Sequence, residues 1–377
     1  MSESIKVIYI VSTLRRTGPT NQLRNIIKFL DREKFDPYLI TLSEEPADSL
    51  ISDFRALKLP IYQINLSRLA GVFFAKCKVE KIIDAIKPDL VHTQGFRADS
   101  LSARMKSNVA KIATIRNFPQ YDYTMTYGNI QGRFMAGQHS RAMRNLDLCV
   151  GVSDAVAENL NLQFSLDNIC SIANGVDTEV YYPVDKGKKL ELRRSLNLEE
   201  GRDIWISSGH LSERKDPLLL ISSWKANFGE DTSKQLVLIG DGPLKQECEK
   251  KIIGCSNVKL LGHVDNVSDY LRASDYYIST SRAEGMPNAV LEALACGLPV
   301  LLSSIPPHQE IFDRDPKVGS LFTIQNPDSL SKGFVDLLSV SLETRVLAAN
   351  CLIDNFFSAK RNSSLYQKAY IELIGEG

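Results

Sequence analysis

Short apolar runs alternate with longer helix-period segments along the whole chain, and no other property of the sequence limits the possible folds as strongly. Each run has the length and composition of a buried strand, and each is followed by a helical pattern. This order predicts parallel sheets with helices on both faces. The runs that we expect to form strands are IKVIYIVS (5–12), YLITL (38–42), DLVHTQ (89–94), KIATIR (111–116), LDLCVGVS (146–153), DIWISSGH (203–210), QLVLIGDG (235–242), VKLLGHV (258–264), YYISTS (276–281) and PVLLSS (299–304).

The strand series is interrupted by ANGVDTEVYYPVD (173–185), whose Gly, Asp and Pro residues predict a linker. A chain of 377 residues exceeds what one hydrophobic core usually supports, so we expect two domains, 1–172 and 173–360. Each domain is predicted to be a doubly wound α/β sheet of the Rossmann-like kind. Ligands of such sheets bind beyond the carboxyl ends of the strands, where the strand order reverses. Two such domains facing one another would place a cleft between them.

Charge and cysteine usage exclude several classes of protein. The 45 basic and 45 acidic residues balance, so the net charge gives no attraction toward nucleic acid. Seven scattered cysteines without a C-x-x-C pair predict a reducing compartment and no metal site. The N-terminus has the pattern of a strand rather than of a signal peptide, and no apolar stretch is long enough to span a bilayer, so we expect a cytoplasmic protein. No G-x-G-x-x-G follows a strand, which argues against an NAD-dependent oxidoreductase.

The segment RAEGMPNAVLEALACGLPV (282–300) carries the clearest chemical signal. Gly285 and Pro287 predict a turn, Asn288 can cap the following helix, and the two carboxylates Glu284 and Glu292 bracket its start. The backbone amides of residues 285–290 should therefore be exposed at a helix N-terminus, where they can bind phosphate oxygens or sugar hydroxyls. An ordinary strand-to-helix turn with solvated glutamates is the alternative reading of the same residues.

The run EGMPNAVLEALACGLPV resembles the Glu–seven residues–Glu signature of the large family-four retaining glycosyltransferases, which have the GT-B fold. The resemblance implies that Glu284 binds hydroxyls of the donor sugar and that Glu292 binds the ribose. It places four further residues near the sugar and diphosphate, with the proline only shaping the loop: Gly285, Met286, Pro287 and Asn288. It also implies that the final helix, 361–377, crosses back to the first domain.

The loop GHLSERKDPLLLI (209–221) resembles the family segment that supplies cations to the donor diphosphate. Lys215 fits the family lysine, whereas His210 occupies the position of the usual arginine. Arg214 can supply the second cation, or a neutral His210 can only form a hydrogen bond. The resemblance thus implies catalytic roles for Glu284, Lys215 and Arg214; solvated loop charge is the alternative for the two cations.

Three more turns resemble donor-binding loops of the family. IGDGP (239–243) and LGHV (261–264) correspond to the turns that contact the base, which selects Gly242 and Val264. RRTGPTNQL (15–23) resembles the glycine loop next to the diphosphate, where Gly18 permits close approach and Asn21 begins the following helix.

On the acceptor side, DLVHTQGFRAD (89–99) resembles a segment at the end of a strand that lines the cleft. Many relatives have a second histidine where this chain has Gln94, so a proton-transfer role would pass to His92, to another group or to the substrate. A lone histidine on an apolar strand is more often part of the packed core. TIRNFPQYDY (114–123) adds Arg116 and Tyr121 as acceptor-side contacts.

The resemblance therefore implies transfer of a hexosyl or N-acetylhexosaminyl group from a UDP-sugar or another NDP-sugar to a hydroxyl, with retained configuration. We expect no cofactor and no required metal, because cations take the place of Mg²⁺. The opening GPTNQL resembles bacterial enzymes of capsule or lipopolysaccharide synthesis, which favours a saccharide or lipid-linked saccharide acceptor. Phe73 and Phe74 among the lysines of residues 66–87 predict peripheral contact with the inner face of the cell membrane, unless this segment is a core-packed helix.

Three other functions are compatible with the same architecture. A nucleotide-sugar epimerase would need the donor and no acceptor. A glycogen-type phosphorylase would need a pyridoxal-binding lysine signature, which we do not find. A non-catalytic scaffold would keep the fold and bind partners, although Glu284, Glu292 and Lys215 together argue against it.

Overall fold

The computed structural model describes residues 4–375 and divides them into two compact α/β units. Unit 1 is the chain up to Gly175 together with the segment from Ala359, and unit 2 is Val176–Ser358. The expected domain boundary, at residue 173, lies three residues before the observed one. The last two residues of the expected final helix lie outside the described residues. The predicted fold class, two parallel α/β sheets, is confirmed.

Unit 1 contains a parallel sheet whose seven described strands run in the order β3-β2-β1-β4-β5-β6-β7. The order reverses between β1 and β4, which pair directly from Val7 with Leu90 to Val11 with Gln94. Its elements are β1 (Ile5–Val11), α1 (Gly18–Lys28), β2 (Phe35–Thr41), α2 (Ile51–Ala56), β3 (Ile61–Gln63), α3 (Arg68–Ile86), β4 (Leu90–Gln94), α4 (Phe96–Ser102), β5 (Ala110–Ile115), α5 (Pro119–Tyr127), α6 (Asn129–Met143), β6 (Leu148–Gly151), α7 (Asp154–Phe164), β7 (Ile169–Ser171) and α16 (Ala359–Gly375).

Unit 2 contains a second parallel sheet, whose six described strands run β10-β9-β8-β11-β12-β13 and reverse between β8 and β11. Trp205 of β8 and Trp224 of α9 pack edge to face in its core, with ring centroids 5.9 Å apart. Its elements are α8 (Lys186–Ser195), β8 (Asp203–Ser208), α9 (Pro217–Phe228), β9 (Lys234–Ile239), α10 (Lys245–Ile252), β10 (Val258–Gly262), α11 (Val267–Ala273), β11 (Tyr276–Ser279), α12 (Asn288–Ala295), β12 (Val300–Ser303), α13 (Pro306–Arg314), the 3₁₀ turn η1 (Pro316–Val318), β13 (Gly319–Phe322), α14 (Pro327–Leu338), α15 (Leu342–Leu352) and the π-helical turn η2 (Ile353–Phe357).

Strand β1 shows why an uninterrupted apolar run becomes a central strand. Successive side chains of a strand point to opposite faces, and both faces of this sheet are covered. Val7 and Tyr9 therefore pack in the core on the side of α1 and α16, whereas Ile8 and Ile10 pack with α3 and α4 on the other side.

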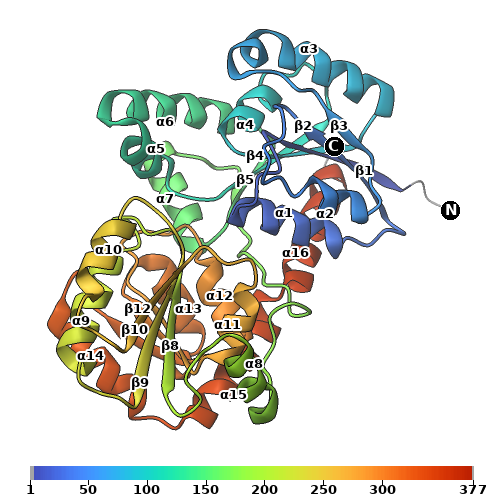
Figure 1. Ribbon diagram of the computed structural model, residues 1–377. Helices are drawn as coiled ribbons and strands as arrows, with labels where there is room; N and C mark the ends of the chain where they lie inside the picture. Colours follow the sequence, from blue (N-terminus) through green and yellow to red (C-terminus); the bar gives the residue numbers. More distant parts are fainter. Residues whose placement is uncertain (1–3, 376–377) are drawn as a thin grey trace. The chain divides into compact units, whose positions relative to one another are not determined.

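Helix α16 belongs to unit 1 and packs against α1 (Figure 1). The Ser363 hydroxyl donates to the Ile26 carbonyl (2.8 Å), and the Asn362 amide donates to the Ala173 carbonyl (2.6 Å). The side-chain amide of Gln22 also holds the backbone of Gly175, donating to its carbonyl and accepting from its N–H. The last helix thus completes the core of the first unit.

Helix α1 begins earlier than the sequence analysis expects. Its first residue is Gly18, three residues before Asn21. Pro19 follows at a position where its missing N–H costs no intrahelical hydrogen bond and where its fixed φ suits the helix. The glycine loop after β1 is therefore shorter than predicted.

We predict that Tyr370→Ala lowers the free energy of unfolding of unit 1 by about 3–5 kcal/mol, because it empties a fully buried site and removes a hydrogen-bond partner of His92. Urea denaturation measures this loss. The milder Tyr370→Phe removes only the hydroxyl and should cost about 1–3 kcal/mol. The matched control is Tyr62→Ala, because Tyr62 is 37% exposed. This substitution should change the free energy of unfolding by no more than about 0.5 kcal/mol. Equal effects of the two alanine substitutions would contradict this packing.

Candidate active site

The principal polar cluster of unit 2 lies at the reversal point of its sheet. The loop after β8 carries Arg214 and Lys215, and the loop after β11 carries Glu284. Because β8 and β11 are neighbours and parallel, their carboxyl ends meet at one edge of the sheet. Residues almost seventy positions apart therefore lie side by side, at the place where doubly wound sheets bind ligands.

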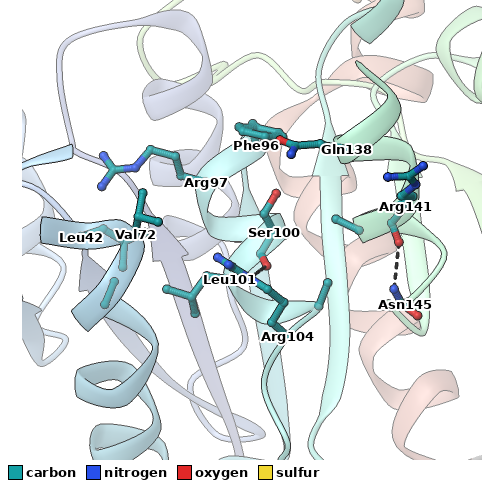
Figure 2. A pocket seen from close by; sticks show the side chains of 14 residues that line it. Leu42, Val72, Phe96, Arg97, Ser100, Leu101, Arg104, Gln138, Arg141 and Asn145 are labelled. Carbon is teal, nitrogen blue, oxygen red and sulfur yellow. Dashed lines mark hydrogen bonds between the residues drawn. The ribbon is translucent and has the colours of Figure 1, made fainter. Parts of the chain in front are cut away.

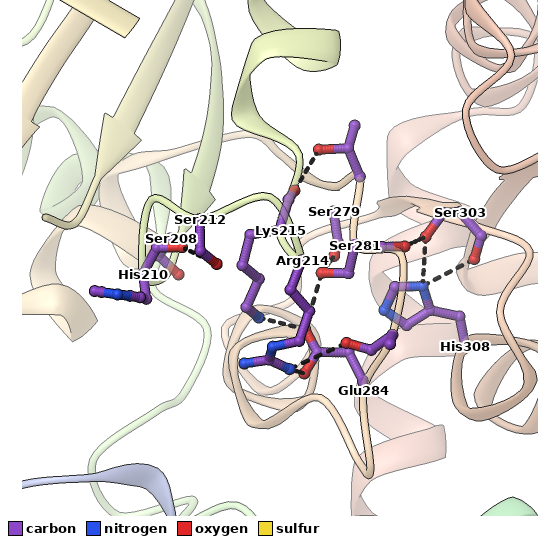
Figure 3. Close-up of polar contacts among 12 residues, drawn as sticks. Ser208, His210, Ser212, Arg214, Lys215, Ser279, Ser281, Glu284, Ser303 and His308 are labelled. Carbon is purple, nitrogen blue, oxygen red and sulfur yellow. Dashed lines mark hydrogen bonds and ion pairs between the residues drawn. The ribbon is translucent and has the colours of Figure 1, made fainter. Parts of the chain in front are cut away.

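Glu284 makes three direct contacts, and two of them join it to the loop after β8 (Figure 3). Its Oε2 lies 2.8 Å from Nη1 of Arg214, and its Oε1 lies 2.5 Å from Nζ of Lys215. The Ser281 hydroxyl donates to Oε1 at 2.8 Å. The carboxylate is only 8% exposed, whereas the Arg214 side chain is 39% exposed. The cluster therefore presents cationic side chains held by a buried anion.

The electrostatics of Glu284 follow from this arrangement. Burial alone would raise its pKa, but Lys215 and Arg214 outweigh burial and hold the pKa at about 2. The carboxylate is therefore ionised throughout the neutral range, and its charge is balanced by the two cations.

A second set of bonds fixes the backbone that carries the cations. Asp216, with φ of 49°, caps α9 and pairs with Arg282 at 2.7 Å. The Thr280 hydroxyl donates to the carbonyls of Lys215 (2.9 Å) and Asp216 (3.0 Å), and the Arg282 N–H donates to the Arg214 carbonyl (2.7 Å). The two loops are thus connected by their backbones as well as by Glu284, which orients Arg214 and Lys215 in advance of any ligand.

Glu292 lies in α12 and is a second carboxylate of this site. Burial raises its pKa to about 7, and Lys215 together with a hydrogen bond from Tyr181 lowers the pKa only in part. Lys215 therefore interacts with both glutamates of the predicted pair. Tyr181 comes from the linker segment, and nothing in the sequence indicated its contact with Glu292.

The turn before α12 differs in detail from the prediction. Pro287 is the N-cap residue and Asn288 is the first helical residue, so Asn288 does not cap the helix as expected. Gly285, Met286 and Pro287 are buried, and the partly exposed part of the turn begins at Asn288. Val290 is buried as well, so only Asn288 and Ala289 of residues 285–290 are partly exposed, and the expected exposure is wrong for the other four because they pack against their own unit.

The other predicted donor residues lie on neighbouring loops. His210 is exposed and its ring points away from Glu284 (Figure 3), so Arg214 is the second cation of the cluster. Gly242 packs tightly on the loop after β8, since a Cβ there would lie 2.5 Å from the Leu211 carbonyl oxygen. Val264 is partly exposed just after β10, and Gly18 is the partly exposed first residue of α1.

Unit 1 has a cavity of about 400 Å³ where its own sheet reverses, which we call the strand-end pocket. Its lining includes Ser12 and Thr13 after β1, Gln94 at the end of β4 and Arg116 after β5. Nη2 of Arg116 donates to Oε1 of Gln94 at 2.7 Å. The structure therefore brings these two predicted acceptor-side residues together.

Two buried polar atoms of residues that line this pocket have no hydrogen-bond partner among the described residues. They are Nε2 of Gln94 and Nε of Arg116. Burial lowers the pKa of Arg116 to about 10, so it remains cationic near neutral pH. Unpaired buried donors are costly in a folded protein, and a ligand rich in oxygen atoms would satisfy them.

His92 belongs to the core, which corrects its assignment to the acceptor side. It is completely buried. Its Nδ1 lies 2.7 Å from the Tyr370 hydroxyl, its Nε2 lies 2.7 Å from the Thr114 hydroxyl, and its ring stacks on Tyr366. Burial lowers the pKa of His92 to about 3, so the ring is neutral.

The predicted tyrosine contact is also displaced. Tyr121 is 58% exposed and is absent from the pocket lining, whereas Tyr123 lines the pocket. The segment after β5 turns into α5 at Pro119, and in a helix side chains two positions apart lie on different faces. Because this segment is helical, Tyr123 and not the predicted Tyr121 lines the pocket.

A hydrogen-bonded chain behind Tyr123 was missed by the sequence analysis. The Tyr123 hydroxyl lies 2.8 Å from Nδ1 of His139, and Nε2 of His139 lies 2.9 Å from Oδ2 of Asp99. The Thr93 hydroxyl donates to the other Asp99 oxygen at 2.6 Å. These contacts fix the phenol at the pocket wall. Asp99 and His139 are forty positions apart, and no local motif links them.

Comparison with known proteins adds family and fold. Residues 16–180 match the model of Glycosyltransferase Family 4, and residues 202–340 match that of Glycosyl transferases group 1. The chain is 24% identical to an Escherichia coli UDP-Gal:alpha-D-GlcNAc-diphosphoundecaprenol alpha-1,3-galactosyltransferase, over 92% of both chains. It is 23% identical to the Escherichia coli O-antigen biosynthesis glycosyltransferase WclY, over 99% of both.

The fold is similar to that of Anabaena HepE in complex with UDP and glucose. The TM-score is 0.78 at 17% sequence identity, and the match covers 97% of this chain and 99% of HepE. Solved neighbours of this kind have the GT-B fold, which is the predicted fold.

The raised pKa of Glu292 predicts a pH-dependent cost in stability. An ordinary unfolded glutamate has a pKa of about 4.3. Between that value and about 7 the folded state holds a proton that the unfolded state has lost, so the stability falls as the pH rises through this range and stays low above it. Glu292→Gln should therefore gain at least about 2 °C in Tm over the natural protein at pH 8, and far less at pH 5.

Thermal unfolding at the two pH values measures this difference. The matched control is Glu249→Gln, at an exposed position of α10, which should shift Tm equally at both. A gain from Glu292→Gln that is the same at pH 5 and pH 8 would show that Glu292 does not titrate in this range.

Proposed function

The chain belongs to the glycosyltransferases, with a family-four domain followed by a group-1 domain, and we propose that it transfers a sugar from a UDP-sugar to a hydroxyl of a lipid-linked saccharide. The observation that carries the proposal is the pair of cations held on Glu284 at the reversal point of unit 2. A nucleotide-sugar carries a diphosphate, and this pair supplies two positive charges on one loop at the carboxyl edge of the sheet.

We assign the donor to unit 2. Arg214 and Lys215 would bind the diphosphate by exchanging part of their contact with Glu284 for phosphate oxygens. Glu284 would then accept hydrogen bonds from sugar hydroxyls, and Glu292 from the ribose. UDP is the first nucleotide to consider, because HepE was solved with UDP and glucose and the name of the Escherichia coli galactosyltransferase specifies UDP-Gal.

We assign the acceptor to unit 1, at the strand-end pocket. The unpaired donors of Gln94 and Arg116 would bind sugar oxygens there, and the oriented Tyr123 hydroxyl adds a third polar contact. A lipid-linked saccharide is the acceptor class that we favour, because the name of the galactosyltransferase contains a diphosphoundecaprenol acceptor. Synthesis of a bacterial surface polysaccharide follows as the proposed role, and WclY is named for O-antigen biosynthesis.

In the proposed reaction the bond between the anomeric carbon and the diphosphate oxygen breaks, and a bond from the acceptor oxygen to the same carbon forms. The acceptor attacks from the face that the diphosphate leaves, so configuration is retained, and its proton passes to the departing diphosphate oxygen. Arg214 and Lys215 stabilise the charge that develops on the diphosphate. Because these side chains would fulfil the role of a metal ion, metal independence is part of the proposal, as is the cytoplasmic location.

Calorimetric titration tests the donor assignment. UDP, GDP and a panel of UDP-sugars are added with and without EDTA, to the natural protein and to Glu292→Ala. We expect micromolar binding of one nucleotide that is insensitive to EDTA and weakened about tenfold or more by the substitution, because a charge-assisted hydrogen bond is lost. Glu249→Ala, at an exposed position of α10, should leave the affinity unchanged.

Absence of binding by every nucleotide would refute the donor site and favour a scaffold that binds partners. Where binding is found, incubation with the donor alone separates two enzyme classes. An epimerase would convert the donor without an acceptor, whereas the proposed transferase leaves its sugar unchanged in configuration.

A further inference from the structure

Unit 1 contains a second cavity, separate from the strand-end pocket, between α3, α4 and α6. Its volume is about 480 Å³, within the range of about 300–1,000 Å³ that is usual for sites of small organic ligands. We call it the α3–α4–α6 slot. Leu42, Val72, Ala75, Leu101 and Ala142 supply apolar walls.

Three arginines complete the lining of the slot, and no aspartate or glutamate contributes to it. Figure 2 shows Arg97 and Arg141 on opposite sides, with Arg104 and Ser100 between them. Arg104 and Arg141 are exposed at the rim. An apolar cavity whose lining contains three cations and no acidic residue matches one ligand chemistry, an apolar chain joined to a strongly anionic group.

Arg97 is part of the packed wall of the slot. Its Nη1 donates to the Ser43 hydroxyl at 2.7 Å, and the residue is partly buried. The helix α3 has Gly71 opposite the guanidinium, where a Cβ would lie 2.7 Å from Nη2 of Arg97. The absence of a side chain at Gly71 thus leaves room for the planar cation between α3 and α4.

The slot continues toward the strand-end pocket. Phe96 and Arg97 line both the slot and a neighbouring hollow of about 700 Å³. That hollow in turn shares Ser12, Gly95 and Tyr123 with the strand-end pocket. A ligand with an apolar chain in the slot and an anionic group at Arg97 would therefore extend its remaining part toward Gln94 and Arg116.

The entrance of the slot has an apolar flank on α3. Val72 lines the slot and is 62% exposed, and its neighbours Leu69 and Phe73 are 80% and 77% exposed. Large exposed apolar side chains beside a cavity mark a contact with an apolar partner. Among residues 4–375, none of the helices has the length and apolar character needed to cross a membrane.

We propose that the α3–α4–α6 slot binds the lipid carrier of the acceptor, with the first part of a prenyl chain against the apolar walls and its diphosphate at the three arginines. This inference rests on the proposed function and deepens it, because it places the carrier in a subsite distinct from the donor site and from the sugar pocket.

Binding of farnesyl diphosphate to the full chain tests the proposal, measured by calorimetry in saturating UDP so that the donor site is occupied. We expect three comparison compounds to bind at least tenfold more weakly than farnesyl diphosphate. Inorganic pyrophosphate lacks the prenyl chain, farnesol lacks the diphosphate, and dihexanoyl phosphatidylglycerol has acyl chains and an anionic group but no prenyl diphosphate. Equal binding of pyrophosphate or of the phospholipid would overturn the assignment.

Two variants locate the site. Arg104→Gln with Arg141→Gln removes the exposed rim charges, and Val72→Glu puts an anion in the slot at an exposed position; each should weaken farnesyl diphosphate at least tenfold. The matched controls change exposed residues away from the slot. They are Arg55→Gln on α2 and Val335→Glu on α14, where Val335 is 68% exposed. Unchanged affinity in both slot variants would refute the slot as the site.

The nucleotide titration distinguishes a failure of the proposed lipid subsite from a failure of the proposed function. If UDP binds to the natural protein and to the slot variants while farnesyl diphosphate does not bind, the lipid subsite fails and the proposed function stands. If no nucleotide binds, the proposed function itself fails. The farnesyl diphosphate titration is then repeated with Lys215→Met, because unchanged affinity in this variant excludes binding at the cation pair of unit 2.

Discussion

The site depends on a single buried carboxylate. Glu284 holds Lys215 and Arg214 from a loop almost seventy residues earlier, and without that charge two cations would stand together on one edge of the sheet. Breaking a buried pair by removing one partner usually costs more than the pair contributes, because the remaining charges lose their compensation. Glu284 therefore serves two purposes. It keeps the cation pair in place before a ligand arrives, and in the proposed function it accepts hydrogen bonds from sugar hydroxyls once phosphate has taken over part of the cationic charge.

The doubly wound architecture makes this arrangement possible without a long-range motif. In each unit the strand order reverses once, and the loops after the two strands at the reversal diverge from one another. In unit 2 these loops carry the charges, and in unit 1 they form the strand-end pocket. The buried strands on which the loops are mounted hold the loop ends in place, as β1 does by filling both covered faces. Function thus depends on loop residues, and their positions depend on core residues that take no part in the chemistry.

The sequence predicted whatever depends on local pattern. Apolar runs indicated the strands, and the family resemblance of the segment from Glu284 to Glu292 selected the loop whose carboxylate holds the cation pair. Contacts between residues that are distant in the sequence could not be predicted from such patterns. His92 looks like a ligand-facing residue until the tyrosines of the last helix are seen to cover it. Tyr121 and Tyr123 differ only by the helical rotation that begins at Pro119. Arg97 could not be placed in a slot, because its neighbours come from α3 and α6, distant in sequence.

The most direct test of the central claim compares UDP affinity in the natural protein and in Glu284→Gln, with Lys215→Met as the reference for a lost cation. If Glu284 restrains the cation pair until phosphate arrives, its neutral isostere should bind UDP about tenfold tighter, a gain of about 1.4 kcal/mol, while losing the preference for a UDP-sugar over UDP. Lys215→Met should weaken both ligands. Unchanged or weaker UDP binding by Glu284→Gln, in a protein that remains folded, would contradict the exchange of the cations between carboxylate and diphosphate.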